Sequence, residues 1–234
     1  MLVELEKELR KHIDQEKAAF FPRFFKSGPG EYGEGDLFLG ITVPDQRKVA
    51  MKFKNLDLKD IEKLLDSKWH EERLTALLIM VLQFKSADTQ KQKQLFEFYL
   101  SKTDRINNWD LVDTSARDIV GAYLFKNQQK LGILNKLVKS KSLWERRIAI
   151  ISTFYFLNKG EPDLTIKIST KLLKDKHDLI HKAVGWMLRE MGKRCDEKLL
   201  TDFLDEHASE MPRTMLRYAI ERLAESKRQQ YLRA

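Results

Sequence analysis

Trp109 and Asp113 are the two side chains whose types and spacing point to chemistry. They lie within residues 107–113, and residues four apart in a helix share one face. No Lys or Arg adjoins Asp113 in the sequence to neutralise it, so an acid beside a large aromatic face can attract a cationic group. The alternative is a buried core tryptophan with a solvated aspartate, because large aromatic residues usually serve packing.

The charge balance of the chain favours a polyanionic partner. Its 234 residues carry 43 Lys and Arg against 35 Asp and Glu, a formal net charge of +8, and the sequence pI is about 9.4. Such a balance suits binding to nucleic acid. With 42% hydrophobic residues and only 10 Gly and 5 Pro, the chain should fold. Because no strand-like alternation of apolar residues is evident, we predict an all-α protein.

Cysteine usage and hydropathy predict a cytoplasmic protein that does not enter a membrane. The single cysteine, Cys195, allows no disulfide within the chain, which favours a reducing compartment. Residues 1–6 are charged and amphipathic, unlike a signal peptide. The longest apolar run, residues 76–82, is far too short to cross a bilayer.

The N-terminal part, residues 1–55, is predicted to hold helices on either side of a glycine-rich loop. A helix over residues 2–21 would place charged side chains on one side and apolar side chains on the other. A helix over residues 43–53 would have Pro44 in its first turn, where proline is favoured. These helices precede the main repetitive part of the chain.

The glycine-rich loop, residues 27–36, contains Gly28, Gly30 and Gly33 in the spacing G-x-G-x-x-G. That pattern indicates a dinucleotide site only after a strand and at the start of a helix. Here an aromatic helix end precedes the glycines and another loop follows them, and no Lys-Ser/Thr pair follows as it would in a P-loop. We therefore interpret the glycines as a tight turn whose aromatic neighbours could contact a ligand.

Residues 56–234 are predicted to form tandem two-helix repeats within a single domain, residues 1–234. Short segments that end in lysine recur here, at Lys68, Lys102, Lys141 and Lys176. Each is followed by an apolar stripe of helical period, and their spacing suits two-helix repeats. Because such units bury their apolar faces by stacking, the predicted fold is an all-α superhelix, a curved solenoid of HEAT-like repeats.

The repeat register groups Trp109 and Asp113 with Arg147 and Trp186. The first two follow the lysine of their repeat by seven and eleven residues, while Arg147 and Trp186 follow theirs by six and ten. Within one residue of slippage, the four occupy equivalent positions one turn apart, and stacked repeats would bring them together on the concave side. In the first repeat two leucines hold these positions, which leaves core packing as an alternative.

No other cluster points to catalysis by a metal or a nucleophile. His177 and His181 are four residues apart, but without a glutamate after the first histidine we interpret them as a solvated helix face rather than a zinc site. No serine or cysteine has a partnered base, and we expect neither a metal nor a cofactor. Basic residues near the C-terminus suit a stripe that follows phosphates: Arg213, Arg217, Arg222, Lys227 and Arg228.

With these residues assembled, the sequence resembles the AlkD family of HEAT-like-repeat alkylpurine DNA glycosylases. The resemblance runs in order across nearly the whole chain, and the combination of its motifs is specific. It is carried by Phe38-Leu39-Gly40-Ile41 with Pro44 and Arg47, by Trp109-Asp110-Leu111-Val112-Asp113, by Trp144-Glu145-Arg146-Arg147, and by Gly185-Trp186-Met187-Leu188-Arg189-Glu190.

The resemblance implies a monofunctional glycosylase that removes cationic alkylated purines, such as 3-methyladenine and 7-methylguanine, from duplex DNA. Asp113 would stabilise the oxocarbenium-like sugar and position water, while Trp109, Trp186 and Arg147 would line the cleft. No lysine is placed as a Schiff-base nucleophile, so strand nicking is not expected. We also expect a monomer that associates with the nucleoid when bound to DNA. The expected DNA-binding residues are Phe24, Lys26, Thr42, Arg47, Arg146, Lys182, Arg189, Arg213 and Arg217.

The chain departs from some members of that family at two expected DNA contacts. They have tyrosine in place of Phe24 and a polar amide in place of Thr42, and their glycine-rich loop is shorter. These departures bear on lesion-strand contacts and on the range of lesions. Two alternatives remain: a non-catalytic HEAT-repeat scaffold that binds nucleic acid or protein, and an RNA-binding module supported by charge alone.

Overall fold

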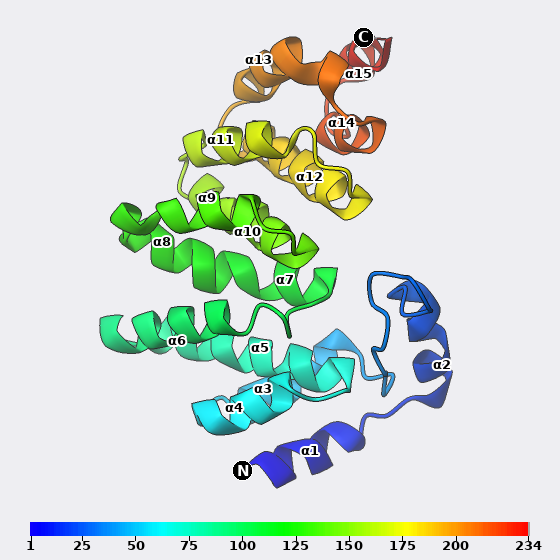
Figure 1. The fold of residues 1–234 in the computed structure, drawn as a ribbon, viewed down its shortest axis with the longest axis vertical. Coiled ribbons are helices and arrows are strands. Elements are labelled where there is room, and N and C mark those ends of the chain that lie inside the picture. Colours follow the sequence, from blue (N-terminus) through cyan, green and yellow to red (C-terminus); the bar gives the residue numbers. More distant parts are fainter. Residues whose placement is uncertain (234) are drawn as a thin grey trace. The chain divides into compact units, whose positions relative to one another are not determined.

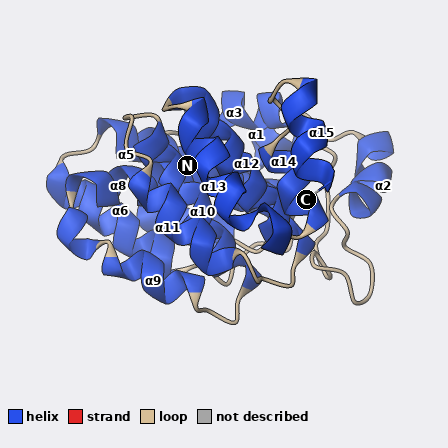
Figure 2. Ribbon diagram, turned by 90° about the horizontal axis from the view of Figure 1, so that it is seen from above, coloured by secondary structure: helices blue, strands red, loops and turns tan. Residues whose placement is uncertain are grey.

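The computed structural model describes residues 1–233, which form helices joined by loops (Figure 2). Within this range there is no β-strand, and the one isolated bridge pairs Leu37 with Trp69 in parallel. The chain divides into two compact units, Met1–Ile119 (unit 1) and Val120–Ala234 (unit 2). Each unit has its own set of packed helices.

Unit 1 is built around the long helix α5, against which α3, α4, α6 and α7 all pack (Figure 1). Helix α5 is buried over most of its length, since 13 of its 17 residues are buried, and helix α1 packs on α3. The helices of this unit are α1 (Leu2–Arg10), α2 (Gln15–Phe24), α3 (Val43–Lys52), α4 (Leu58–Leu65), α5 (His70–Ser86), α6 (Thr89–Ser101) and α7 (Trp109–Ala116).

The N-terminal segment contains two helices where we predicted one over residues 2–21, so that prediction is wrong. Helix α1 ends at Arg10, and Asp14 caps α2 by accepting a hydrogen bond of 3.0 Å from the backbone N–H of Lys17. Aspartate is a strong N-cap residue and starts a new helix at such a position. Helix α2 contains no buried residue. The predicted helix over residues 43–53 is confirmed as α3, with Pro44 in its first turn.

Unit 2 is built from helices that pack in pairs. Helix α9 packs on α10 and α11 on α12, and α12 also packs on α13 and α14. The π-helix Arg117–Gly121 spans the division between the units. The other elements are α8 (Ala122–Lys126), the 3-10 turn Gln128–Lys130, α9 (Gly132–Val138), α10 (Leu143–Leu157), α11 (Asp163–Leu172), α12 (Asp178–Arg194), α13 (Glu197–His207), the 3-10 turn Ala208–Glu210, α14 (Arg213–Ala219) and α15 (Glu225–Arg233).

Helices α12 and α14 pack on each other and approach closely at Gly185, which yields a prediction for stability. A Cβ atom at this position would lie 2.4 Å from the carbonyl oxygen of Met215 and 2.5 Å from the Cβ of Tyr218. Because backbone atoms cannot move aside as a flexible side chain does, Gly185→Ala should lower the free energy of unfolding by about 1–3 kcal/mol. Urea unfolding followed by circular dichroism measures this loss.

Gly132, at the start of α9, provides the matched control. A Cβ there would meet no atom within 4 Å, and alanine is the better helix former, so Gly132→Ala should leave stability unchanged or raise it by up to about 1 kcal/mol. Equal urea midpoints of unfolding for the wild type and Gly185→Ala would contradict this prediction and show that α12 and α14 separate easily at Gly185.

Candidate functional site

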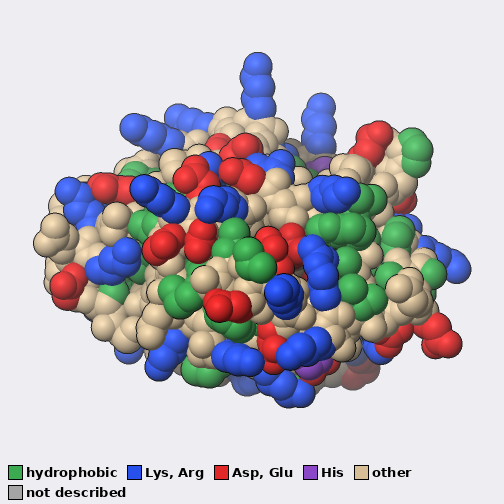
Figure 3. Space-filling model, turned by 90° about the horizontal axis from the view of Figure 1, so that it is seen from below, with side chains coloured by type: hydrophobic (Ala, Val, Ile, Leu, Met, Phe, Trp, Pro, Cys, Tyr) green, Lys and Arg blue, Asp and Glu red, His purple; other side chains and the backbone are tan. Residues whose placement is uncertain are grey.

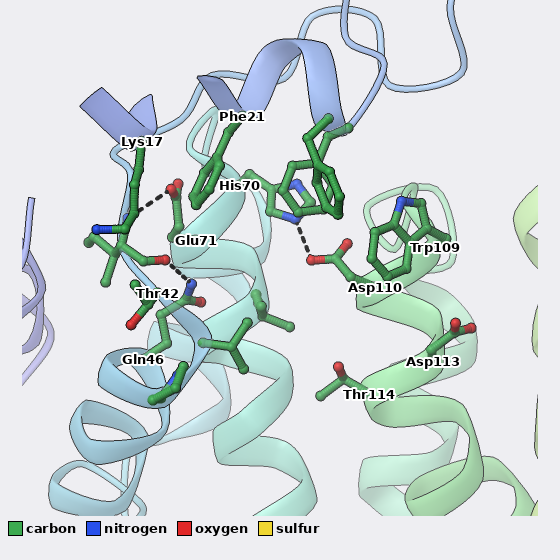
Figure 4. A pocket seen from close by; sticks show the side chains of 16 residues that line it. Lys17, Phe21, Thr42, Gln46, His70, Glu71, Trp109, Asp110, Asp113 and Thr114 are labelled. Atoms are coloured by element: carbon green, nitrogen blue, oxygen red, sulfur yellow. Dashed lines mark hydrogen bonds and ion pairs between the residues drawn. The ribbon is translucent and has the colours of Figure 1, made fainter. Parts of the chain in front are cut away.

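A cavity of about 480 Å³ opens within unit 1, beneath α2 and between α3, α5 and α7 (Figure 4). Its walls are largely aromatic and aliphatic, and four aromatic side chains line it together with carboxylates from α5 and α7. The lining includes Phe21, Phe24, Phe25, Trp109, Asp110 and Asp113. The cavity therefore combines aromatic faces with acidic groups, a combination that suits a cationic ligand.

Trp109 is the first residue of α7 and forms one wall of this cavity. Its backbone N–H donates a hydrogen bond of 2.8 Å to the side chain of Asn108, the N-cap residue. Its indole stacks on Phe25, with ring centroids 5.6 Å apart, and meets Phe24 edge-on at 5.8 Å. Because the indole is only partly buried, it is available to a ligand and is not sealed in the core.

Asp113 lies one turn further along α7 and lines the same cavity (Figure 4). The spacing of four residues thus brings the carboxylate and the indole to one face, and Asp113 is partly buried. The negative charge of Asp113 also acts on Tyr99, a buried residue of unit 1. Burial raises the pKa of the Tyr99 hydroxyl, which lies 2.9 Å from the hydroxyl of Ser115, and the negative charge of Asp113 raises it further. Asp113 therefore contributes negative potential in a poorly solvated part of the unit.

His70, the first residue of α5, is a buried histidine that our sequence analysis did not identify. Its Nδ1 lies 2.9 Å from a carboxylate oxygen of Asp36, and its Nε2 lies 2.8 Å from a carboxylate oxygen of Asp110. Burial lowers the pKa of His70, but the charge of Asp110 and the hydrogen bonds to both carboxylates outweigh burial and raise the pKa to about 9. Arg73 donates a hydrogen bond of 2.6 Å to the other oxygen of Asp36.

The glycine-rich loop supplies Asp36 to this network and supports the start of α7. At Gly33 a Cβ atom would lie 2.7 Å from the carbonyl oxygen of Phe25 and 3.1 Å from the side-chain nitrogen, Nδ2, of Asn108. Gly30 and Gly35 have positive φ angles of 75° and 87°, which favour glycine. The loop is a series of turns, and its contacts make it part of the frame that holds Trp109.

Glu71, the neighbour of His70 on α5, holds the opposite wall of the cavity. Its buried carboxylate accepts hydrogen bonds from three consecutive backbone N–H groups, at 3.0 Å from Leu39, 2.8 Å from Gly40 and 3.3 Å from Ile41. Gly40 has a φ of 80°, and a Cβ there would lie 2.0 Å from the carbonyl oxygen of Asp14. This carboxylate therefore fixes the segment against which α2 is placed.

Two of the four predicted DNA-binding residues of unit 1 line the cavity, and the other two are exposed elsewhere in the unit. Phe24 stands at the rim with 50% of its surface exposed. Thr42 lines the cavity, and its hydroxyl donates a hydrogen bond of 2.7 Å to Asp45. Lys26, which directly precedes the glycine-rich loop, and Arg47, on α3, are both exposed. Their contacts with DNA stay a prediction.

In unit 2, Arg147 and Trp186 occupy neighbouring helices. Arg147 lies on α10, is buried, and donates a hydrogen bond to the carbonyl oxygen of Leu179. Trp186 lies on α12, is partly buried, and meets Phe154 edge-on with centroids 5.7 Å apart. Our expectation that these two residues share one cleft with Trp109 stays a prediction.

The remaining predicted DNA-binding residues of unit 2 are held to different degrees. Those on α10 and α12 are engaged in ion pairs with acidic neighbours, while those on α14 are exposed. The residues are Arg146, 2.6 Å from Asp175; Lys182, 2.7 Å from Asp178; Arg189, paired with Glu221; and the exposed Arg213 and Arg217. Exposed cations suit phosphate contacts, whereas paired cations must exchange their partner to make them.

Three further observations describe the chain outside the cavity. Residues 1–233 contain no group of three or more His, Cys, Asp or Glu side chains that could hold a metal ion. None of the helices in this range combines the length and apolar character needed to span a bilayer. On the face shown in Figure 3, basic and acidic side chains are interspersed, so the excess of positive charge does not form a uniform field there.

Comparisons with known proteins agree with this architecture. A family model described as DNA alkylation repair enzyme matches residues 5–223, and a search of curated proteins finds no significantly similar sequence. A solved structure described as "Predicted DNA alkylation repair enzyme from Enterococcus faecalis" has a TM-score of 0.72 at 18% identity, over 92% of this chain and 98% of that chain. AlkD2 from Streptococcus mutans has a TM-score of 0.57 at 19% identity, over 90% of this chain and 99% of that chain.

At such low identities the similarity to solved structures shows the fold. It confirms the predicted fold class, an all-α superhelix of HEAT-like helix pairs. The family match over residues 5–223 covers nearly the whole sequence and confirms the resemblance drawn from the motifs.

Proposed function

The chain belongs to the DNA alkylation repair enzyme family, and on that premise we propose that it is a monofunctional DNA glycosylase. Its substrates are cationic alkylated purines in duplex DNA, such as 3-methyladenine and 7-methylguanine. The observation that carries the proposal is the placement of Asp113 and Trp109 on one face of α7, lining an aromatic cavity. A carboxylate in such surroundings favours a group that becomes more positive during the reaction.

The reaction is a hydrolysis of the N-glycosidic bond. A purine alkylated at N3 or N7 carries a positive charge and departs as a neutral base, taking the electron pair of the C1′–N bond with it, so no general acid is needed. The deoxyribose becomes oxocarbenium-like, as sugars do in glycoside hydrolysis. Water then attacks C1′ and loses a proton. Asp113 stabilises the positive sugar and orients the water or accepts its proton.

Aromatic faces and basic side chains bind the damaged strand in this proposal. Trp109 and Trp186 attract the cationic nucleotide by cation–π interaction, worth about 1 kcal/mol or more per desolvated contact. Arg147 binds a backbone phosphate beside the lesion, and for this its buried guanidinium exchanges the carbonyl oxygen of Leu179 for the phosphate. The other basic residues named above contribute affinity for DNA that falls as salt concentration rises. The protein would act as a monomer, without metal or cofactor, in the cytoplasm and on the nucleoid.

The experiment that tests the proposal incubates the purified protein with duplex DNA treated with dimethyl sulfate. Free bases are separated from the DNA and identified by mass spectrometry. We expect release of 3-methyladenine and 7-methylguanine with intact strands, since no lysine nucleophile forms part of the mechanism. The same DNA without protein, and DNA that has been heated to release these bases, are the controls.

No base release from any alkylated duplex would contradict the glycosylase and favour a non-catalytic scaffold. In that case Trp109→Ala should leave DNA binding unchanged, because a scaffold does not need the indole beside Asp113. Equal affinity for duplex DNA and duplex RNA over a salt series would favour an RNA-binding role instead.

A further inference from the structure

We infer that His70 is a positioning residue, whose imidazolium ties the glycine-rich loop to the first turn of α7 and so orients Trp109 and Asp113. Its effect on base release rests on the proposed function. Its effect on the geometry of unit 1 does not, and the two can be measured separately.

The hydrogen-bond geometry requires a proton on both ring nitrogens of His70. Nδ1 faces a carboxylate oxygen of Asp36 at 2.9 Å and Nε2 faces one of Asp110 at 2.8 Å. Ionised carboxylates only accept hydrogen bonds, so each ring nitrogen must donate. A neutral imidazole has a single N–H and would leave one carboxylate oxygen opposite a lone pair.

The charges of the network balance only when His70 is protonated. From the glycine-rich loop, Asp36 faces the ring; from α7, Asp110; and from α5 itself, Arg73 lies against Asp36. The carboxylate of the adjacent Glu71 is occupied by the backbone N–H groups of residues 39–41. All four members of the network are buried, with at most 8% of their surface exposed. Loss of the proton would leave one uncompensated negative charge in this interior, which is costly.

Two routes connect His70 to the indole of Trp109. The first is the backbone, because Asp110 follows Trp109 directly in the first turn of α7, and Asp113 lies one turn later. The second is a stack of rings. Phe25 lies 4.7 Å from the ring of His70 and 5.6 Å from the indole, tilted by 35° and 22° respectively. A change at His70 therefore reaches both the position of the helix and the plane of the indole.

The two arms of the network differ in what holds them once the proton is lost. Asp36 still accepts a hydrogen bond from the guanidinium of Arg73. Asp110, in contrast, is joined to α5 by its hydrogen bond with His70. We therefore expect the Asp110 arm to loosen first. The stabilisation from a pKa raised above the usual 6.5 is complete below about pH 6.5 and is lost as pH rises through about 9.

The test observes Trp109 directly, by ¹⁹F NMR of protein labelled with 5-fluorotryptophan. The chain has 4 tryptophans, and Trp109→Phe identifies the signal. In the wild type this signal should shift between pH 7 and 10 with a midpoint near the pKa of about 9. His70→Gln should abolish that titration and displace the signal at pH 7. His12→Gln is the matched control, since His12 is a partly exposed histidine of the same unit, and it should leave the titration unchanged.

Base release provides the second readout. At pH 7, His70→Gln should release 7-methylguanine about tenfold more slowly or worse in single-turnover assays, with DNA affinity within about twofold of the wild type. A Trp109 signal that stays constant from pH 7 to 10 in the wild type overturns the inference, and this observation needs no variant that folds. A folded His70→Gln protein with an unchanged signal and rate overturns it as well. If the wild type releases no base while its Trp109 signal titrates, the proposed function fails and the positioning role stands.

Discussion

Asp113→Asn should slow the release of 7-methylguanine from methylated duplex DNA by about 10²–10³-fold, while DNA binding stays within about threefold of the wild type. Asparagine has nearly the same shape but no negative charge, so it can neither stabilise a positive deoxyribose nor accept a proton from water. The loss is large because the carboxylate lines a largely apolar cavity, where a charge acts more strongly than in bulk water. Single-turnover release, quantified by mass spectrometry, and fluorescence anisotropy with undamaged duplex measure the two quantities.

Asp104 offers a matched control for Asp113→Asn. It is an exposed carboxylate of the same unit, between α6 and α7, so Asp104→Asn removes an equal charge from outside the cavity and should change base release by less than about twofold. This comparison separates the local role of Asp113 from the effect of total charge on DNA affinity. Full activity of Asp113→Asn would remove this residue from the mechanism.

The second large effect concerns stability. Glu71→Ala should lower the free energy of unfolding by about 3 kcal/mol or more, because it leaves three buried backbone N–H groups without their acceptor. Glu71→Gln should fall between the wild type and Glu71→Ala, since one amide oxygen can still accept while the NH₂ group opposes the remaining donors. Urea unfolding monitored by circular dichroism gives the free energies.

Glu97 on α6 serves as the control for this series. It is exposed, and its ion pair of 3.8 Å with Lys93 is exposed as well, so Glu97→Ala should change stability by less than about 0.5 kcal/mol. A loss below about 1 kcal/mol for Glu71→Ala would mean that water or another group satisfies residues 39–41.

The helices of the repeats were predictable because their signals are local. The apolar stripe of helical period after each of the four lysines predicted a helix, and the structure has α5, α7, α10 and α12 at these places. The single predicted helix over residues 2–21 failed because apolar periodicity continues across the break, whereas the break itself is set by Asp14 as an N-cap and by the close approach of Gly40. The second of these contacts joins distant parts of the chain and leaves no local pattern.

The candidate site was predictable where its residues lie close together in the sequence. A spacing of four residues was enough to place Trp109 and Asp113 on one face of a helix. The network around His70 was not predictable, because its partners lie 34 and 40 residues away in the sequence. The signals that could have found it are the aspartate that ends the glycine-rich loop and the arginine three residues after His70 on α5.

Helix α2 forms the roof of the cavity and yet buries none of its own residues (Figure 4). Segments with so little buried surface detach at a small fraction of the free energy needed to unfold a domain. Because α3 and α7 both pack on the buried helix α5, we expect the roof to open at a lower free-energy cost than the walls, and unit 1 to admit groups larger than its cavity of about 480 Å³.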